Sequence, residues 1–319
     1  MRCPQCQHDQ KYKYGLVCQG CGYRFVFDKR QCGFTDGRFF AAIRVASQEG
    51  TAHFTSNQLY AVFALKQLNR FAWLGITIVF GLIPGIILSI VQENGWFLLL
   101  TLLAGIAGAL FHYSGMRKSP IKPTQFRSYL ARWKKKGYAR FMDHYIDKPT
   151  LHEPPPEWPE RDMYDYGAER LLLVEKDYLV DWLVKNNLHT DHRSLIMSIN
   201  GYPDYLLPKA NRLLEQRPDL PVYLLHHASG VTMSTTLTSS KKFRIKDHPV
   251  TDLGVFPHQM TRIKGFKHLP ITAKLAPVDL MAGGPLFQLL ANAIAQSQSM
   301  YEADDDDLWS FALEFSDFG

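Results

Sequence analysis

The sequence predicts a multidomain membrane protein with a small four-cysteine module, a two-helix transmembrane hairpin and an α/β domain whose sheet is mostly parallel. Three observations predict this fold class. Two CxxC pairs lie within the first 21 residues, two apolar runs of 21 residues each contain no charge, and strand patterns alternate with helical patterns after residue 170. The 319 residues suffice for two or three domains, with an ordinary globular balance of 46% hydrophobic and 21% charged residues.

The N-terminal module, residues 1–28, contains four cysteines at metal-ligand spacing. They are Cys3, Cys6, Cys18 and Cys21, with eleven residues between the two pairs. Each pair can hold one side of a tetrahedral ion, and residues 1–27 resemble the zinc ribbon family, with Gly20 and Gly22 where the second knuckle must turn tightly. The resemblance implies a zinc ion. Because four thiolates leave no open coordination position, its role should be structural.

Two disulfides are the alternative use of the same four cysteines. The metal is favoured because the topology described below places the module in the cytoplasm, where thiols are kept reduced. Cys32 is a spare thiol in this scheme. The spacing does not decide whether the ribbon binds nucleic acid, binds protein or caps the terminus.

Residues 29–69 predict a helical hairpin. Its helices cover 36–50 and 55–70, and Thr55 or Ser56 is the expected N-cap of the second. A DNA-binding helix-turn-helix is the alternative. A packed hairpin is favoured, because the second helix offers only Lys66 and Arg70 for phosphate contact.

Residues 70–117 predict two transmembrane helices, Phe71–Val91 and Trp96–Met116, joined by a four-residue loop. Two buried helices in a soluble core are the alternative. Lysine and arginine flank the outer ends of the two runs and the loop carries only Glu93, so both termini are expected in the cytoplasm at a bacterial-type inner membrane. Small residues at four-residue spacing in each run allow close helix contact, within the hairpin or between protomers of an oligomer.

Residues 118–160 predict a basic juxtamembrane helix followed by a Pro-rich linker, HEPPPEWPE. Residues 117–140 contain nine Lys/Arg and no Asp/Glu, with Phe126 and Leu130 at helical spacing opposite the charges. The bilayer surface is the favoured partner of this helix. Nucleic acid is the alternative, with Lys134, Lys135 and Lys136 following phosphates beside a stacking Trp133.

Residues 161–300 predict an α/β domain. Apolar strands begin at Arg170, Leu195, Pro221 and Val250, and helical patterns separate the first three, which indicates a mostly parallel sheet covered on both faces. Functional groups in such sheets gather at the carboxyl ends of strands. Glu175 ends the first strand, and two histidines in PVYLLHHASG end the third.

The motifs VEKD, INGYPD, PVYLLHHASG and DLGVFPHQ, over residues 168–260, resemble the Toprim domain of the topoisomerase VI A subunit and its relatives. The resemblance implies that Glu175 matches the catalytic glutamate, whereas His227 and Ser229 occupy the places of two magnesium-binding aspartates. Because a histidine and a hydroxyl replace anionic ligands poorly, a non-catalytic domain is expected. The alternative is a phosphoryl-transfer site at Glu175, His227 and Ser229 with zinc or manganese.

The acidic tail, residues 301–319, contains four consecutive aspartates followed by Leu308, Trp309 and Phe311. Such a segment is typical of a motif that folds on a protein partner, or of a helix that docks back on its own chain. The expected function is a membrane-anchored, cytoplasm-facing scaffold or sensor for a protein or nucleic-acid partner. The alternative is a membrane-tethered, metal-dependent nuclease, and Glu175→Ala distinguishes the two. The net charge of +6 comes largely from the juxtamembrane segment and says little about DNA.

Overall fold

The computed structural model describes residues 1–68, 121–153, 167–229, 242–245, 247–255, 275–281 and 283–302. The chain divides into two compact units. The larger unit comprises Met1–Val62 and Arg127–Gly319, and the smaller comprises Phe63–Phe126. Residues 154–160 of the predicted Pro-rich linker at 152–160 and almost all of the predicted acidic tail lie outside the described residues.

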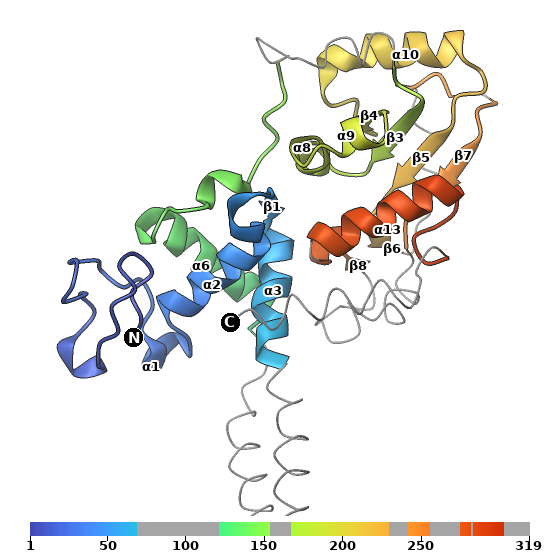
Figure 1. Cartoon of the computed structure of the whole chain (residues 1–319). Helices are drawn as coiled ribbons and strands as arrows, with labels where there is room; N and C mark the ends of the chain where they lie inside the picture. Colours follow the sequence, from blue (N-terminus) through green and yellow to red (C-terminus); the bar gives the residue numbers. More distant parts are fainter. Residues whose placement is uncertain are drawn as a thin grey trace, which may run out of the picture. The chain divides into compact units, whose positions relative to one another are not determined.

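The larger unit contains a four-stranded parallel sheet with the strand order β4-β3-β5-β7. Its strands are β3 (Arg170–Val174), β4 (Ser194–Ser198), β5 (Val222–Leu225) and β7 (Val250–Asp252). Figure 1 shows the strands side by side. All four strands predicted from the apolar runs are present and parallel, so this part of the fold prediction is confirmed.

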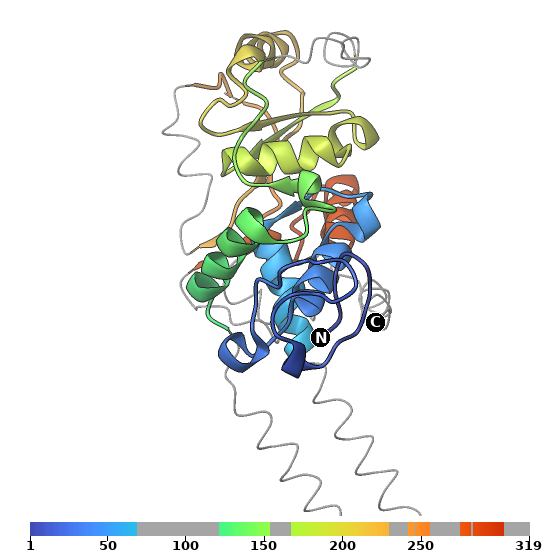
Figure 2. The same ribbon diagram turned by 90° about the vertical axis from the view of Figure 1, so that its left-hand side faces the viewer.

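Helices cover both faces of the sheet, as a parallel sheet of apolar strands requires. Alternate residues of β3, β4 and β5 pack with Ala210 and Leu214 of α10 (Leu207–Gln216) on one face. On the other face the Tyr223 hydroxyl donates to the Ile294 carbonyl of α13 (Gly283–Gln296), and Trp182 of α8 (Asp177–Lys185) stacks on Phe287. Figure 2 shows α10 on one side of the sheet and α8 with α13 on the other.

The N-terminal segment of the larger unit is built around an aromatic core. Phe27 contacts Phe34, Phe39 of α2 (Asp36–Ala46) and, on α6 (Pro123–Lys136), Tyr129 and Trp133. The Trp133 ring stacks on Phe27 with a centroid distance of 5.9 Å and an interplanar angle of 12°. The apolar face predicted for the basic helix is therefore present, and the protein core covers it.

The helices predicted over 36–50 and 55–70 are observed as α2 and α3 (Ser56–Leu68). Thr55 caps α3 as expected: its hydroxyl accepts from the Gln58 N–H, and the Gln58 side chain accepts from the Thr55 N–H. This reciprocal pair is a capping box. Phe54–Thr55 forms β1, which pairs with β2 (Tyr145–Ile146). In the smaller unit, the rings of Phe63 and Phe126 lie 5.5 Å apart.

Short elements complete the described chain. They are the helices α1 (Lys29–Cys32) and α9 (Leu188–Asp191), the antiparallel strands β6 (Ala228–Ser229) and β8 (Leu275–Ala276), and the 3-10 turns η1 (Tyr12–Tyr14), η2 (Gln48–Gly50), η3 (Met142–His144), η4 (Asp204–Leu206) and η6 (Val278–Leu280). The turn η6 lies directly before α13 and brings Asp279 to the sheet's carboxyl edge.

The prediction of a membrane protein requires correction. Among the described residues, no helix has the length and apolar character needed to cross a membrane. The longest there are α6 and α13, with 14 residues each, or about 21 Å against the roughly 30 Å of a bilayer core. The predicted spans 71–91 and 96–116 lie outside the described residues. The two-span fold class and the inner-membrane localisation are therefore not supported, and both are withdrawn.

Candidate metal centre

Two similar knuckles bring the four N-terminal cysteines together. In the first, the Cys3 N–H donates to the His8 carbonyl and the Cys3 carbonyl accepts from Gln7. In the second, Cys18 makes the equivalent bonds to Tyr23 and Gly22. The residue after each second cysteine turns with a positive φ, 63° at Gln7 and 75° at Gly22, which favours glycine at the second position. The tight turn predicted there is confirmed at Gly22.

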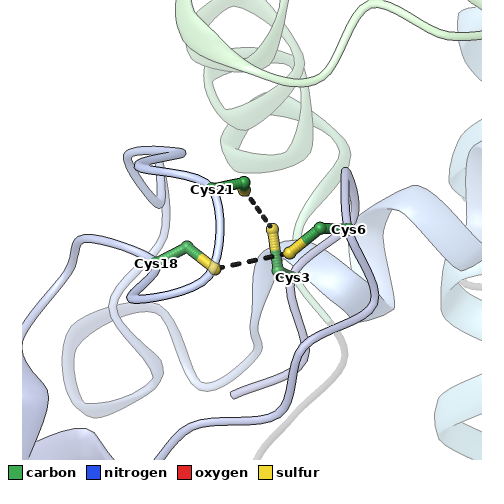
Figure 3. A group of neighbouring side chains, drawn as sticks. All are labelled: Cys3, Cys6, Cys18 and Cys21. Atoms are coloured by element: carbon green, nitrogen blue, oxygen red, sulfur yellow. Dashed lines mark hydrogen bonds between the residues drawn. The ribbon is translucent and has the colours of Figure 1, made fainter.

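The four sulfurs face one another from two loops, as Figure 3 shows. Their ligand atoms all lie within 4.8 Å of each other, and the Cys3–Cys21 and Cys6–Cys18 sulfur pairs are both 3.6 Å apart. Zinc–sulfur bonds of about 2.3 Å set the sulfurs of a regular tetrahedron about 3.8 Å apart. A disulfide bond is about 2.05 Å long, and all four cysteines are free. The cluster can therefore hold one metal ion.

The surroundings of the four thiols differ. Cys3 and Cys18 are buried with Phe25, whereas Cys6 and Cys21 are exposed. Burial raises the pKa of Cys3 to about 12. Burial also raises the pKa of Cys18, but the Gly20 and Cys21 N–H groups and the neighbouring thiols outweigh it and lower the pKa to about 7. Metal binding requires thiolates at all four positions, so it would release protons from the cluster.

Two buried polar side chains hold the knuckles in place. The Gln10 amide donates to the carbonyls of Gly15 and Val17 and accepts from the Gln19 N–H, so it fixes both the loop between the knuckles and the second knuckle. The Asp36 carboxylate accepts from the Tyr23 hydroxyl and from the Val26 and Phe27 N–H groups. The segment from Tyr23 to Phe27, which follows the second knuckle, is thereby fixed to the first turn of α2.

The predicted binding residues of the basic helix lie in different environments. Trp133 is 1% exposed and packed in the aromatic core, so a base could stack on it only if that core opened. Lys134 pairs with Asp147, lies over the Tyr145 ring and lines a pocket of about 250 Å³. Lys135 and Lys136 are exposed.

The second predicted site lies at the carboxyl edge of the sheet, where Glu175 follows β3. One Glu175 oxygen accepts from the His227 N–H at 2.9 Å, and the other lies 2.9 Å from the Lys176 ammonium. Burial raises the pKa of Glu175, but Lys176 and the His227 N–H lower it more, so the carboxyl is ionised at neutral pH. Each of its oxygens therefore has one partner among the described residues.

His227 follows β5, and both of its ring nitrogens have partners. The Val278 N–H donates to Nδ1 at 3.1 Å, which assigns the ring proton to Nε2. Nε2 lies 3.3 Å from the Tyr178 hydroxyl, and that hydroxyl donates to the buried Asp279 carboxylate. Burial lowers the pKa of His227 and favours the neutral ring. A metal ion would have to displace one of these partners.

His226 lies away from His227, against β7. Its Nδ1 donates to the His227 carbonyl oxygen at 2.6 Å, and its Nε2 lies 3.1 Å from the Asp252 carboxylate. Burial lowers the pKa of His226, but Asp252 and the carbonyl raise it more. The two rings therefore do not converge on one point. Ser229 lies in β6 with its backbone opposite Leu275.

The motif DLGVFPHQ begins with Asp252 but gives it no role, and no sequence pattern singles out Gln10, Asp36 or Asp279, although all four side chains organise these sites. Asp279 binds Thr55, Asn57 and Tyr178, all distant in sequence. Asp252 faces the distant His226 and also accepts from the nearby Gly254 N–H. In the part of the chain that the structure describes, no second group of three or more His, Cys, Asp or Glu side chains comes close enough to hold a metal ion.

No family model matches this chain, and no curated protein or solved structure matches it. The resemblance to the Toprim domain therefore stays a prediction.

Proposed function

We propose that this protein is a scaffold whose N-terminal ribbon folds around one structural zinc ion and whose α/β segment supports partner binding without catalysing a reaction. The observation that carries the proposal is the closed set of four cysteine sulfurs within 4.8 Å of one another. Four protein ligands fill a tetrahedral site and leave no position for a substrate or a reactive water.

Zinc is the metal that best fits this donor set. Soft thiolates suit zinc and iron better than magnesium or calcium, and zinc sites with four cysteines are characteristically structural. Gly22 and the buried Cys3 and Cys18 supply the turn and the small apolar core that such a site needs. A module this small lacks a large core, so the bound ion would contribute much of its folding free energy.

The carboxyl edge of the sheet supports the non-catalytic half of the proposal. Glu175 accepts from the His227 N–H and pairs with Lys176. The His227 ring contacts the Val278 N–H and the Tyr178 hydroxyl. Together these contacts stabilise the edge. The alternative, a metal-dependent nuclease that uses Glu175, His227 and Ser229, has less support. It needs a convergent set of free oxygen or nitrogen ligands, but both ring nitrogens of His227 have partners and each Glu175 oxygen contacts a donor.

The experiment uses the full-length chain, with zinc and iron measured by inductively coupled plasma mass spectrometry and plasmid cleavage assayed with magnesium and with manganese. We expect one zinc per chain, loss of that zinc in Cys18→Ser, retention in the matched control Cys32→Ser, and no cleavage. Divalent-ion-dependent cleavage that disappears in Glu175→Ala would contradict the scaffold and establish the nuclease.

A further inference from the structure

The loop between the two cysteine knuckles gathers exposed apolar side chains. Four large hydrophobic residues are exposed in the described part of the chain, and three of them lie inside this loop, within the four consecutive positions 14–17. Tyr14 is 52% exposed, Leu16 41% and Val17 43%. We call residues 11–17 the ribbon loop. Isolated apolar residues on a surface need no explanation, but a local cluster indicates a contact surface.

The ribbon loop is held in one conformation. The Gln10 side chain binds the carbonyls of Gly15 and Val17, and Gly15 ends the η1 turn with φ 79°. The Tyr12 hydroxyl accepts from the Lys29 N–H. These bonds fix the backbone while leaving the Tyr14 ring half exposed. A fixed surface binds a partner with less ordering cost than a mobile one.

The same surface is basic. Lys11, Lys13, Arg24, Lys29 and Arg30 are exposed, and none forms an ion pair with a carboxylate among the described residues. The two acidic residues of positions 1–30 are both engaged. Asp9 pairs with the N-terminal ammonium at 2.9 Å, and Asp28 caps α1 by accepting from the Arg30 N–H. A zinc ion bound by four thiolates carries two net negative charges, which offsets only part of this positive charge.

Cations and tyrosine rings alternate along the ribbon loop in the sequence KYKY. The Lys13 ammonium lies 5.1 Å from the centre of the Tyr14 ring, and the Arg30 guanidinium lies 5.9 Å from the centre of the Tyr12 ring. Single-stranded nucleic acids are bound by surfaces of this kind, in which cations follow phosphates and aromatic rings stack on unpaired bases. An acidic peptide would use the charges but would not require the ring.

From these observations we infer that the ribbon loop binds single-stranded nucleic acid, with Tyr14 stacking on a base and Lys11, Lys13 and Arg30 contacting phosphates. This inference rests on the proposed function, because the zinc ion would hold the knuckles from which the loop extends. It names the partner class that the scaffold would bind.

The test is fluorescence anisotropy of a labelled 15-nucleotide oligo(dT) titrated with the full-length chain over a series of salt concentrations. Tyr14→Ala should weaken binding about 5- to 150-fold, because stacking on one aromatic ring contributes about 1–3 kcal/mol per base. Tyr14→Phe keeps a stacking ring and should bind like the wild type. The double variant Lys11→Ala/Lys13→Ala should reduce the slope of log K against log salt by about 1.4, or about 0.7 per lost contact.

Arg212→Ala is the matched control, because Arg212 is an exposed cation on α10. It should leave binding unchanged within about twofold. The inference is overturned if oligo(dT) does not bind at low salt, or if Arg212→Ala weakens binding as much as Tyr14→Ala does. It is also overturned if a labelled peptide of sequence EADDDDLWSFALEFSDFG binds in a Tyr14-dependent manner and oligo(dT) does not, since the partner is then an acidic polypeptide.

Zinc analysis of the same samples separates the two proposals. One zinc per chain without oligo(dT) binding removes this inference and leaves the zinc scaffold standing. Tyr14-dependent oligo(dT) binding by a chain without metal would support the role of the ribbon loop and contradict the proposal of a structural zinc ion.

Discussion

At the scale of single residues, His226 is held between two acceptors in a buried position. Its Nδ1 donates to the His227 carbonyl and its Nε2 faces Asp252, while Glu175 adds a more distant negative charge. Burial opposes protonation of the ring, but the two acceptors outweigh it and raise the pKa. The charged form of His226 therefore stabilises the folded state.

The sign of the pH dependence follows from that shift. The stabilisation is fully present below the unfolded pKa of about 6.5 and is lost as the pH rises through the higher folded pKa. We expect the free energy of unfolding, measured by urea titration, to fall more between about pH 6 and pH 9 in the wild type than in His226→Gln. Asp252→Asn should remove the same pH dependence. Equal pH dependence in all three proteins would contradict this assignment.

Gly254 lies against the same ring. A Cβ atom added at Gly254 would lie 2.0 Å from His226 Nε2, which is too close for any pair of non-bonded atoms. We predict that Gly254→Ala displaces the ring and lowers the free energy of unfolding by about 1–3 kcal/mol. The alternative is that replacing any loop glycine by alanine lowers the free energy of unfolding through backbone strain, and Gly15→Ala tests it. A Cβ at Gly15 meets nothing within 4 Å, so strain at its positive φ is that variant's only cost.

At the scale of elements, α6 shows what a helical pattern can and cannot predict. The spacing of Phe126, Leu130 and Trp133 predicts a helix with one apolar face, and α6 has that face. The same spacing would suit a lipid surface or a protein core. The deciding contacts come from Phe27 and Phe39, which lie about a hundred residues earlier. Periodicity identifies the face but not what covers it.

The two faces of α6 should therefore respond differently to substitution. We predict that Trp133→Ala lowers the free energy of unfolding by about 3–5 kcal/mol, because it empties a packed aromatic site. Lys135→Ala on the exposed face should change that free energy by less than about 0.5 kcal/mol. Chemical denaturation of the purified variants gives both values. A Trp133→Ala variant as stable as the wild type would show that Phe27 and Trp133 do not pack as described.

The cysteine knuckles and the sheet show that features set by nearby residues can be predicted, whereas contacts between distant segments cannot. The knuckles could be predicted from the sequence because their ligands lie within 21 residues and their spacing reflects one local geometry. The four strands could be predicted from continuous apolar runs. The partners of His226 and His227 could not, because Asp252, Val278 and Tyr178 reach the edge from separate segments.

At the scale of the whole molecule, Asp279 joins segments that are far apart in sequence. Its buried carboxylate accepts from the Thr55 hydroxyl, the Asn57 amide and the Tyr178 hydroxyl. Thr55 also caps α3, so one carboxylate connects the N-terminal helices to α8 and to the turn before α13. Both parts of the larger unit should therefore lose stability together when this carboxylate is removed.

We predict that Asp279→Ala lowers the free energy of unfolding by at least about 1–3 kcal/mol, since it leaves buried donors without an acceptor. The exposed Asp219 is the matched control, and Asp219→Ala should change the same quantity by less than about 0.5 kcal/mol. Hydrogen exchange measured by mass spectrometry should show faster exchange in Asp279→Ala both near Thr55 and near Tyr178. Faster exchange on one side alone would contradict the linking role.

The metal centre underlies both proposals, because the ribbon and its loop are built around the four cysteines. The measurement that tests it most directly is X-ray absorption spectroscopy at the zinc edge on the full-length chain as purified, with the metal content determined on the same sample. We expect one zinc per chain with four sulfur ligands at about 2.3 Å. A chain without metal, a disulfide between these cysteines, or a zinc ion with nitrogen or oxygen ligands would contradict it.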